Sequence, residues 1–180
     1  MTTGTGRPDI VWRPARAADD AFLLQLYADT RAPELAATGW DTATYDAFMR
    51  MQFDLQRRAY RASHPASVCH VVCIADTGEP IGRVWVAEAD TELRLLDISL
   101  LSAWRGQGIG GACVTALQAQ ARSRALALGL HVEMGNRARR LYERLGLVAF
   151  DAQGLHIAMR WVPPTDSPTV RSQETMHEQA

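Results

Sequence analysis

The sequence predicts an α+β domain in which two helices precede an antiparallel meander of strands. Two amphipathic helical patterns come first, and three strand patterns joined by short turns follow them. A strand–helix–strand–helix–strand alternation then completes the fold. The 180 residues fit one domain, predicted to span residues 1–162, and the 47% hydrophobic content is enough for its core.

The first part of the chain predicts an edge strand and two helices. Residues 10–13 form a short apolar segment typical of an edge strand. Asp19 or Asp20 is suited to cap a helix that runs to about Arg31, and a second helix is predicted over residues 44–62. Both segments carry apolar residues at helical spacing, so each helix has one face to bury.

The pattern then changes to strands. Three are predicted, over residues 68–75, 81–89 and 93–101. Short turns rich in Asp, Thr and Gly separate them, which favours an antiparallel meander.

The last third of the chain alternates between helix and strand. A helix is predicted from Gly111 to about Leu128, with Gly129 as its C-cap. The remaining predicted segments are a strand over 130–133, a helix over 136–145, a turn region over 150–154, a strand over 155–161 and a mobile polar tail over 163–180.

Composition excludes several classes of protein. The 19 basic residues, all arginine, and the 20 acidic residues leave a net charge of -1, which argues against a nucleic-acid partner. The first nine residues do not resemble a signal peptide, and no apolar run reaches the ~20 residues that span a bilayer. We therefore expect a cytoplasmic protein with no membrane partner. Three cysteines without a second ligand pair predict neither a disulfide framework nor a metal site.

A glycine-rich turn between a strand and a helix carries the strongest chemical information. The stretch LRLLDISLLSAWRGQGIGG, residues 93–111, places Gly106, Gly108, Gly110 and Gly111 at a helix start. Glycines let a ligand approach the backbone, and amides at a helix N-terminus attract anions such as a pyrophosphate. Tight helix packing is the alternative explanation of these glycines.

The same glycines also spell a dinucleotide fingerprint. Gly106, Gly108 and Gly111 form G-x-G-x-x-G, and Glu133 lies near the distance of a ribose-binding acid. That fingerprint belongs in the first turn of a doubly wound parallel sheet, whereas here it follows an antiparallel meander. A nicotinamide-dependent oxidoreductase is therefore the least favoured function.

Two motifs resemble those of the GNAT N-acetyltransferase superfamily. R-G-Q-G-I-G at residues 105–110 is similar to its acyl-CoA loop, and N-R-A-R-R-L-Y-E-R-L-G-L at residues 136–147 is similar to its second motif. The similarity covers residues 10–161. It departs from the family in two places: Leu147 replaces the usual Phe, and Ala103 stands where Pro is common. The resemblance implies the GNAT acyl-CoA N-acyltransferase fold, an α+β fold of the three-layer sandwich type with a central mixed, mostly antiparallel sheet flanked by helices.

The resemblance also implies acetyl-CoA as co-substrate, with no metal. The strand before the loop is then expected to hydrogen-bond the pantetheine arm through its backbone, and the loop amides to hold the pyrophosphate. The cofactor-binding residues implied in this way are Ile98, Ser99, Leu100, Arg105, Gly106, Gln107, Gly108, Ile109, Gly110, Gly111, Asn136 and Tyr142.

In such enzymes a neutral amine attacks the thioester directly, so the reaction needs a base and an acid. Tyr142 matches the family's acid tyrosine, with aromatic packing as its alternative role. His131, Asp97 and Glu133 are candidate bases, and a base acting through water stays open. Each of these side chains could instead be structural, and Asn136 could serve as a helix N-cap alone.

The acceptor pocket is expected within residues 34–60. Trp40, Gln52 and Phe53 are its tentative contacts, with Arg57 nearby, although helix packing explains them equally well. The predicted acceptor is a primary amine on a small molecule or a peptide, and the superfamily suggests a homodimer. An acyl-CoA-binding module without turnover is the alternative function.

Overall fold

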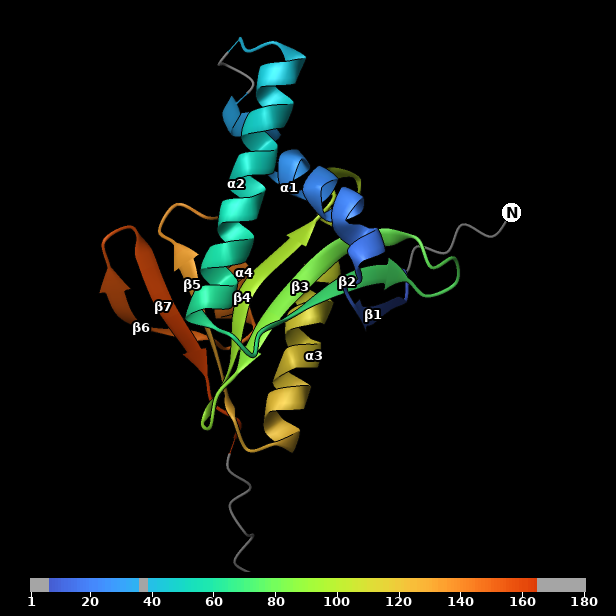
Figure 1. The fold of residues 1–180 in the computed structure, drawn as a ribbon. Coiled ribbons are helices and arrows are strands. Elements are labelled where there is room, and N and C mark those ends of the chain that lie inside the picture. The colour runs from blue at the N-terminus through green and yellow to red at the C-terminus, as the bar shows by residue number, and fades with distance from the viewer. Residues whose placement is uncertain (1–6, 36–38, 165–180) are drawn as a thin grey trace, which may run out of the picture.

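The computed structural model describes residues 7–35 and 39–164. In this part of the chain, seven strands form one sheet in the order β1-β2-β3-β4-β5-β7-β6, and helices cover both of its faces (Figure 1). The strands are β1 (Ile10–Pro14), β2 (Val68–Ile74), β3 (Pro80–Glu88), β4 (Glu92–Leu100), β5 (Ala127–Glu133), β6 (Val148–Gln153) and β7 (His156–Trp161). The helices are α1 (Asp20–Leu35), α2 (Thr42–Ser63), α3 (Ile109–Ser123) and α4 (Ala138–Arg144), with 3-10 turns at Ala17–Asp19 and Ser102–Trp104. The predicted α+β architecture is confirmed.

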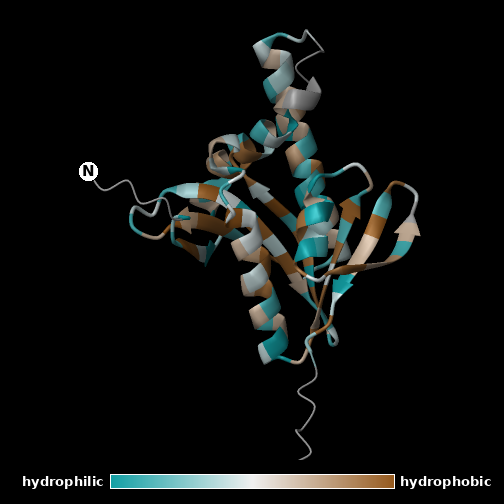
Figure 2. Ribbon diagram, turned by 180° about the vertical axis from the view of Figure 1, so that it is seen from behind, coloured by the Kyte–Doolittle hydropathy of each residue, from teal (hydrophilic) through white to brown (hydrophobic). Residues whose placement is uncertain are grey.

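Two hydrophobic clusters hold the helices to opposite faces of the sheet. The larger one buries the inner side of α3, including Ile109, Val114 and Leu117, against the central strands. The smaller one joins α1 and α2 to β2 through residues such as Leu23 and Phe53. Figure 2 shows the hydrophobic residues concentrated in the central strands, which this double cover removes from water.

The parallel pair at the centre of the sheet separates halfway along its length. β4 and β5 are the one parallel pair, and their pairing in the described strands runs from Glu92–Ala127 to Leu95–Leu130. β4 then continues to Leu100 beside β3, while β5 continues beside β7. The two strands therefore diverge, and their facing edges beyond Leu95 and Leu130 are left for other partners.

A β-bulge in β4 decides which side chains face which helices. The register moves from Leu95 opposite Val86 to Asp97 opposite Trp85, so Leu96 is an extra residue. The alternation of side chains shifts there, because Leu95 and Ile98 both pack in the α3 cluster. Asp97 consequently faces the side of α1 and α2. An acid inside an apolar run is thus explained by the bulge.

Two predicted boundaries near β5 are wrong. The helix predicted to reach Leu128 ends at Ser123, where Ala125 takes a left-handed φ of 54° and turns the chain. Leu128 is fully buried in β5 instead. Gly129, predicted as a C-cap, also lies in β5, where a Cβ would come within 2.4 Å of the Glu92 carboxylate carbon. Core burial overrides the helix propensity of this stretch.

Two further boundaries differ from the predictions. The predicted turn region at 150–154 is mostly strand β6, and the turn itself lies at Gly154 and Leu155. Helix α1 continues past Arg31 to Leu35. Most of the predicted tail, from residue 165 onward, lies outside the described residues, as does Thr38 between the two helices.

Candidate active site

A cleft of about 840 Å³, called here the main cleft, opens where β4 and β5 diverge. Helices α1 and α2 wall it on one side, and the start of α4 lies at another. It is lined by Tyr27, Thr30, Arg31, Gln56, Ala59, Tyr60, Ser63, His64, Arg83, residues 94–100, Arg105, Gly110, residues 130–133, Asn136, Ala138, Leu141, Tyr142 and His156. Its size lies within the range of small-molecule sites.

The glycine-rich loop uses its glycines in two ways. Gly106 and Gly108 have left-handed φ values of 75° and 79°, which other residues adopt only with strain. Gly110 and Gly111 face α4, where added Cβ atoms would lie 3.8 and 3.5 Å from the side chain of Leu141. The first pair therefore shapes the loop, whereas at the second pair a small side chain would make only ordinary van der Waals contact with α4.

The loop presents unused backbone donors at the start of α3. Within the described residues, no hydrogen bond uses the amides of residues 106–111, whereas the amide of Ala112 already donates to the Gly108 carbonyl. Gly108 caps the 15-residue helix with no side-chain hydrogen bond. Free amides at the positive end of a helix fit the pyrophosphate of coenzyme A. The amide donors predicted for the loop therefore lie together, as binding of a pyrophosphate requires.

Asp29 of α1 anchors this loop directly. Its carboxylate accepts hydrogen bonds from the Ser102 amide at 2.9 Å, from the Ser102 hydroxyl at 2.8 Å and from Arg105 Nη2 at 2.6 Å. Arg105 Nε also donates to the Leu100 carbonyl at 2.8 Å. The guanidinium of Arg105 therefore braces the loop. Gln107 likewise turns back, donating from Nε2 to the Ala103 carbonyl at 2.8 Å.

Beyond Leu95, no described strand pairs with the edge of β4 that faces β5, called here its free edge, although the Leu100 carbonyl already accepts a hydrogen bond from Arg105 Nε. Ile98, Ser99 and Leu100 pair with β3 on one edge, and they lie beyond the last residue pair of β4 with β5 on the other. All three line the main cleft. An extended amide-bearing chain such as pantetheine could pair with this edge as an added strand.

Tyr142 of α4 lines the main cleft. It is 6% exposed and belongs to the α3-side hydrophobic cluster. Burial, with a smaller contribution from the charge of Asp97, raises the pKa of its phenol to about 12. The hydroxyl accordingly stays protonated at neutral pH and is available as a donor.

Asp97 is committed to an ion pair. Arg83 Nε donates to its carboxylate at 2.7 Å, and the Ser99 hydroxyl donates to it at 3.0 Å. Arg83 is 2% exposed, and its Nη2 donates to the Gln56 side-chain oxygen at 2.7 Å. Asp97 thus compensates a buried cation, which makes it poorly suited to carry away a proton during turnover.

His131 and Glu133 line the opposite wall, on β5. Both side chains are exposed, and along the strand they alternate with the buried residues Leu130 and Val132. Partial burial, helped by the nearby charge of Arg94, holds the pKa of His131 below its ordinary value of 6.5. The imidazole is therefore neutral at pH 7 and able to accept a proton.

Asn136 stands at the start of α4, where its side-chain oxygen accepts the Ala138 amide at 2.9 Å. The side chain lines the main cleft as well. The N-cap of α4 is Arg137 and not Asn136 as predicted, but Asn136 accepts the first amide of α4 and leaves its own amide nitrogen available to a ligand.

None of the three residues predicted for the acceptor lines the main cleft. Trp40, 43% exposed, packs edge-on against Phe48, and Gln52 lines neither this cleft nor the smaller cavity beside it. The connected ends of α1 and α2 project away from the sheet (Figure 1). Phe53 is buried against Tyr27 with ring centroids 5.8 Å apart, and it lines the smaller cavity.

Three residues that line the main cleft were not predicted from the sequence, namely Gln56, Tyr60 and Arg83. Gln56 and Tyr60 lie one helical turn apart on α2 and both line the cleft, and Tyr60 donates its hydroxyl to the Leu96 carbonyl at 3.3 Å. Arg83 is the other omission. A lone arginine inside the apolar strand at residues 81–87 was the feature of the sequence that could have revealed it.

Other kinds of site were also sought. Among residues 7–35 and 39–164, no group of three or more His, Cys, Asp or Glu side chains is placed to hold a metal ion. In the same part of the chain, no helix is long and apolar enough to cross a membrane.

Comparisons with known proteins agree with this geometry. The model of the acetyltransferase (GNAT) family matches residues 24–147. No curated protein matches the chain.

Solved structures share the fold. PaiA N-acetyltransferase of Thermoplasma acidophilum, in complex with coenzyme A, superposes with a TM-score of 0.64 at 16% identity, over 86% of this chain and 99% of that one. A histone acetyltransferase HPA2-related protein of Corynebacterium glutamicum gives 0.60 at 24% identity, over 91% and 99%. Spermidine N-acetyltransferase of Vibrio cholerae, in complex with coenzyme A and spermine, gives 0.56 at 19% identity, over 84% and 92%. At these low sequence identities, the similarity shows a shared fold and nothing more.

Proposed function

Because this chain belongs to the acetyltransferase (GNAT) family, whose members depend on acyl-CoA, we propose that it moves an acetyl group from acetyl-CoA to a primary amine. One observation carries the proposal. The unused amides at the start of α3 and the free edge of β4 adjoin the same main cleft as the protonated phenol of Tyr142.

The donor half of the cleft fits coenzyme A. The amides of residues 106–111 would hold the pyrophosphate, the edge at Ile98, Ser99 and Leu100 would pair with the pantetheine arm, and Asn136 would contribute its free side-chain amide. Acetyl-CoA supplies the activated carbonyl, a thioester. Asp29 keeps these groups in place through Ser102 and Arg105.

We assign the proton transfers to His131 and Tyr142. The amine nitrogen attacks the thioester carbonyl carbon, the carbon–sulfur bond breaks, and no covalent intermediate with the protein forms. The neutral imidazole of His131 takes the proton that the amine loses, directly or through one water. Tyr142 donates its hydroxyl proton to the departing thiolate. Asp97 is assigned a positioning role, through its ion pair with Arg83.

The charge of the cleft favours an acceptor with little positive charge beyond its amine. Among its lining residues, Arg83, Arg94 and Arg105 are paired with Asp97, Glu92 and Asp29. The Vibrio relative was crystallised with the polycation spermine. Outside these ion pairs, the described lining offers a polycation the carboxylate of Glu133 alone, so we propose a neutral or anionic amine, small or peptidic.

Thiol release from acetyl-CoA tests the proposal. Purified protein would be assayed with amino acids, amino sugars, short peptides and spermidine, and products identified by mass. Turnover with a neutral or anionic amine supports the function, and preferential turnover of spermidine contradicts the expected acceptor. Saturable acetyl-CoA binding without thiol release across the panel would favour an acyl-CoA-binding module instead.

A further inference from the structure

A second cavity lies beside the main cleft on the same face of the sheet. It measures about 370 Å³ and lies between the start of α1, the middle of α2 and strands β2 and β3. Buried Leu23, Phe53 and Trp85 contribute to its walls. Arg83 lines both the cavity and the main cleft, so this side chain stands between them.

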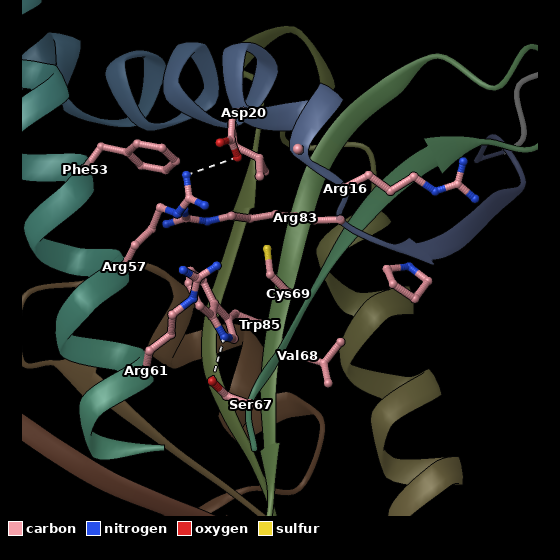
Figure 3. Close-up of a pocket in the computed structure, with 14 residues that line it drawn as sticks. Arg16, Asp20, Phe53, Arg57, Arg61, Ser67, Val68, Cys69, Arg83 and Trp85 are labelled. Carbon is pink, nitrogen blue, oxygen red and sulfur yellow. Dashed lines mark hydrogen bonds and ion pairs between the residues drawn. The ribbon is translucent and has the colours of Figure 1, made fainter. Parts of the chain in front are cut away.

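The cavity is strongly basic. Arg16, Arg57, Arg61 and Arg83 line it, and Asp20 is the single acid among the lining residues. Figure 3 shows Arg57 and Arg61 directed from α2 toward Arg83 and Trp85 on β3. Three guanidinium groups from two elements therefore meet over one small volume.

The acids near these arginines neutralise only part of their charge. Asp20, half exposed, pairs with Arg57 at 3.0 Å, and Asp97 pairs with Arg83 from the main cleft. Arg61 forms no hydrogen bond or ion pair with any residue that the structure describes. An uncompensated positive charge is left at the mouth of the cavity.

Arg83 also carries an unused buried donor. Its Nε and Nη2 groups donate to Asp97 and Gln56, and these two nitrogens share one edge of the planar guanidinium. Nη1 lies on the other edge, away from Asp97, and is buried with no hydrogen-bond partner among the described residues. Buried donors without acceptors are rare because they cost free energy, so the position calls for an acceptor.

We propose that this cavity is an anion site for a small carboxylate- or phosphate-bearing molecule. Its oxygens would accept hydrogen bonds from Arg83 Nη1 and from Arg57 and Arg61, in the forked geometry that guanidinium groups offer to such anions. Burial raises the pKa of the neighbouring Cys69 thiol to about 11, so the thiol stays neutral and adds no negative charge against the ligand.

The site is distinct from the coenzyme A loop and does not depend on the acceptor. Its ligand would contact one edge of Arg83 while Asp97 holds the other, so occupancy is linked to the wall of the main cleft. A phosphate or carboxylate in this cavity therefore shares the charge of Arg83 with Asp97.

Nuclear magnetic resonance tests the site directly. The indole N–H of Trp85, which donates to the Ser67 hydroxyl at 3.1 Å, lines the cavity and can be assigned with Trp85→Phe. Inorganic phosphate and acetate would be titrated separately into the full chain, first alone and then with coenzyme A present, at ionic strength held constant with chloride. We expect a saturable shift of the Trp85 signal. The more potent anion identifies the ligand as a phosphate or a carboxylate.

Two arginines of α2 form a matched pair for this experiment. Arg61 lines the cavity, whereas Arg58 is an exposed arginine of the same helix that does not. Arg61→Ala should weaken the anion about tenfold, and Arg58→Ala should leave the affinity unchanged within about twofold. Arg57→Ala, which removes a second guanidinium, should weaken it similarly, so the test does not rely on substituting the buried Arg83.

Three results would overturn the proposal. The Trp85 signal could stay still under both anions, Arg58→Ala could weaken binding as much as Arg61→Ala, or chloride alone could reproduce the shift. None of these results bears on acetyl-CoA binding or thiol release, so the anion site and the proposed function fail independently.

Discussion

The two halves of the main cleft are built from different materials. The donor half consists of backbone groups, namely the amides of residues 106–111 and the free edge of β4. The acceptor half consists of side chains from several elements, joined in the network of Gln56, Arg83 and Asp97. Backbone groups suit a ligand that stays the same, such as coenzyme A. Side chains can be substituted to suit a different acceptor while the fold stays the same.

The largest expected effect separates chemistry from binding. Tyr142→Phe removes the proposed acid but keeps the buried ring, so kcat should fall about 100-fold or more while acetyl-CoA affinity is unchanged. Tyr60→Phe is the control, because Tyr60 lines the same cleft and burial also raises its pKa to about 12. Steady-state kinetics beside calorimetry decide the matter. Equal losses in both variants would remove Tyr142 from the acid role.

A second substitution tests the backbone conformation of the glycine-rich loop in the donor half. Gly108→Val forces a β-branched residue to a φ of 79° and should reduce acetyl-CoA affinity about 100-fold by distorting the loop. Gly78→Val is the matched control, since Gly78 has a φ of 71° in the turn between β2 and β3. Both variants should lose comparable thermal stability. Unchanged affinity in Gly108→Val would argue against the loop as the pyrophosphate site.

The acceptor half is tested by pH. The pKa of His131 lies below 6.5, so kcat/KM of the native protein should rise as pH increases through that pKa and then level off. His131→Gln should lower the plateau about tenfold or more and abolish the rise. A rate profile that still rises with pH below 6.5 in His131→Gln would assign the base elsewhere, with Glu133 the next candidate on the same strand.

The smallest effect concerns the link between the halves. Asp29→Asn weakens the three hydrogen bonds that tie α1 to Ser102 and Arg105, so KM for acetyl-CoA should rise about fivefold with kcat nearly unchanged. Asp46→Asn, an exposed acid of α2, serves as control. If KM stays constant in Asp29→Asn, the loop keeps its shape without α1.

The donor half could be predicted from the sequence because its determinants are local. Four glycines between a strand and a helix specify the loop within a few residues of each other, and the left-handed angles of Gly106 and Gly108 are ones that glycine adopts without strain. Asn136 and Tyr142 could be placed because their motif is continuous. The order of strands and helices follows from periodicity in the same way.

The acceptor half could not be predicted, because it depends on long-range register. The bulge at Leu96 turns Asp97 toward α2, and no residue near Leu96 in the sequence predicts a bulge there. Arg83 meets Gln56 across 27 positions of chain, so neither residue reveals the other. Trp40 resembles a pocket aromatic by composition, yet it packs on Phe48 at a distance from the cleft lining.

Calorimetric titration with acetyl-CoA, run beside coenzyme A and NAD, tests the central claim most directly. The amides at the start of α3 and the free edge of β4 predict saturable binding of acetyl-CoA with one site per chain, competition by coenzyme A and no binding of NAD. Well-folded protein that fails to bind acetyl-CoA, or that binds NAD instead, would contradict the assignment of the donor half and the acetyl transfer built on it.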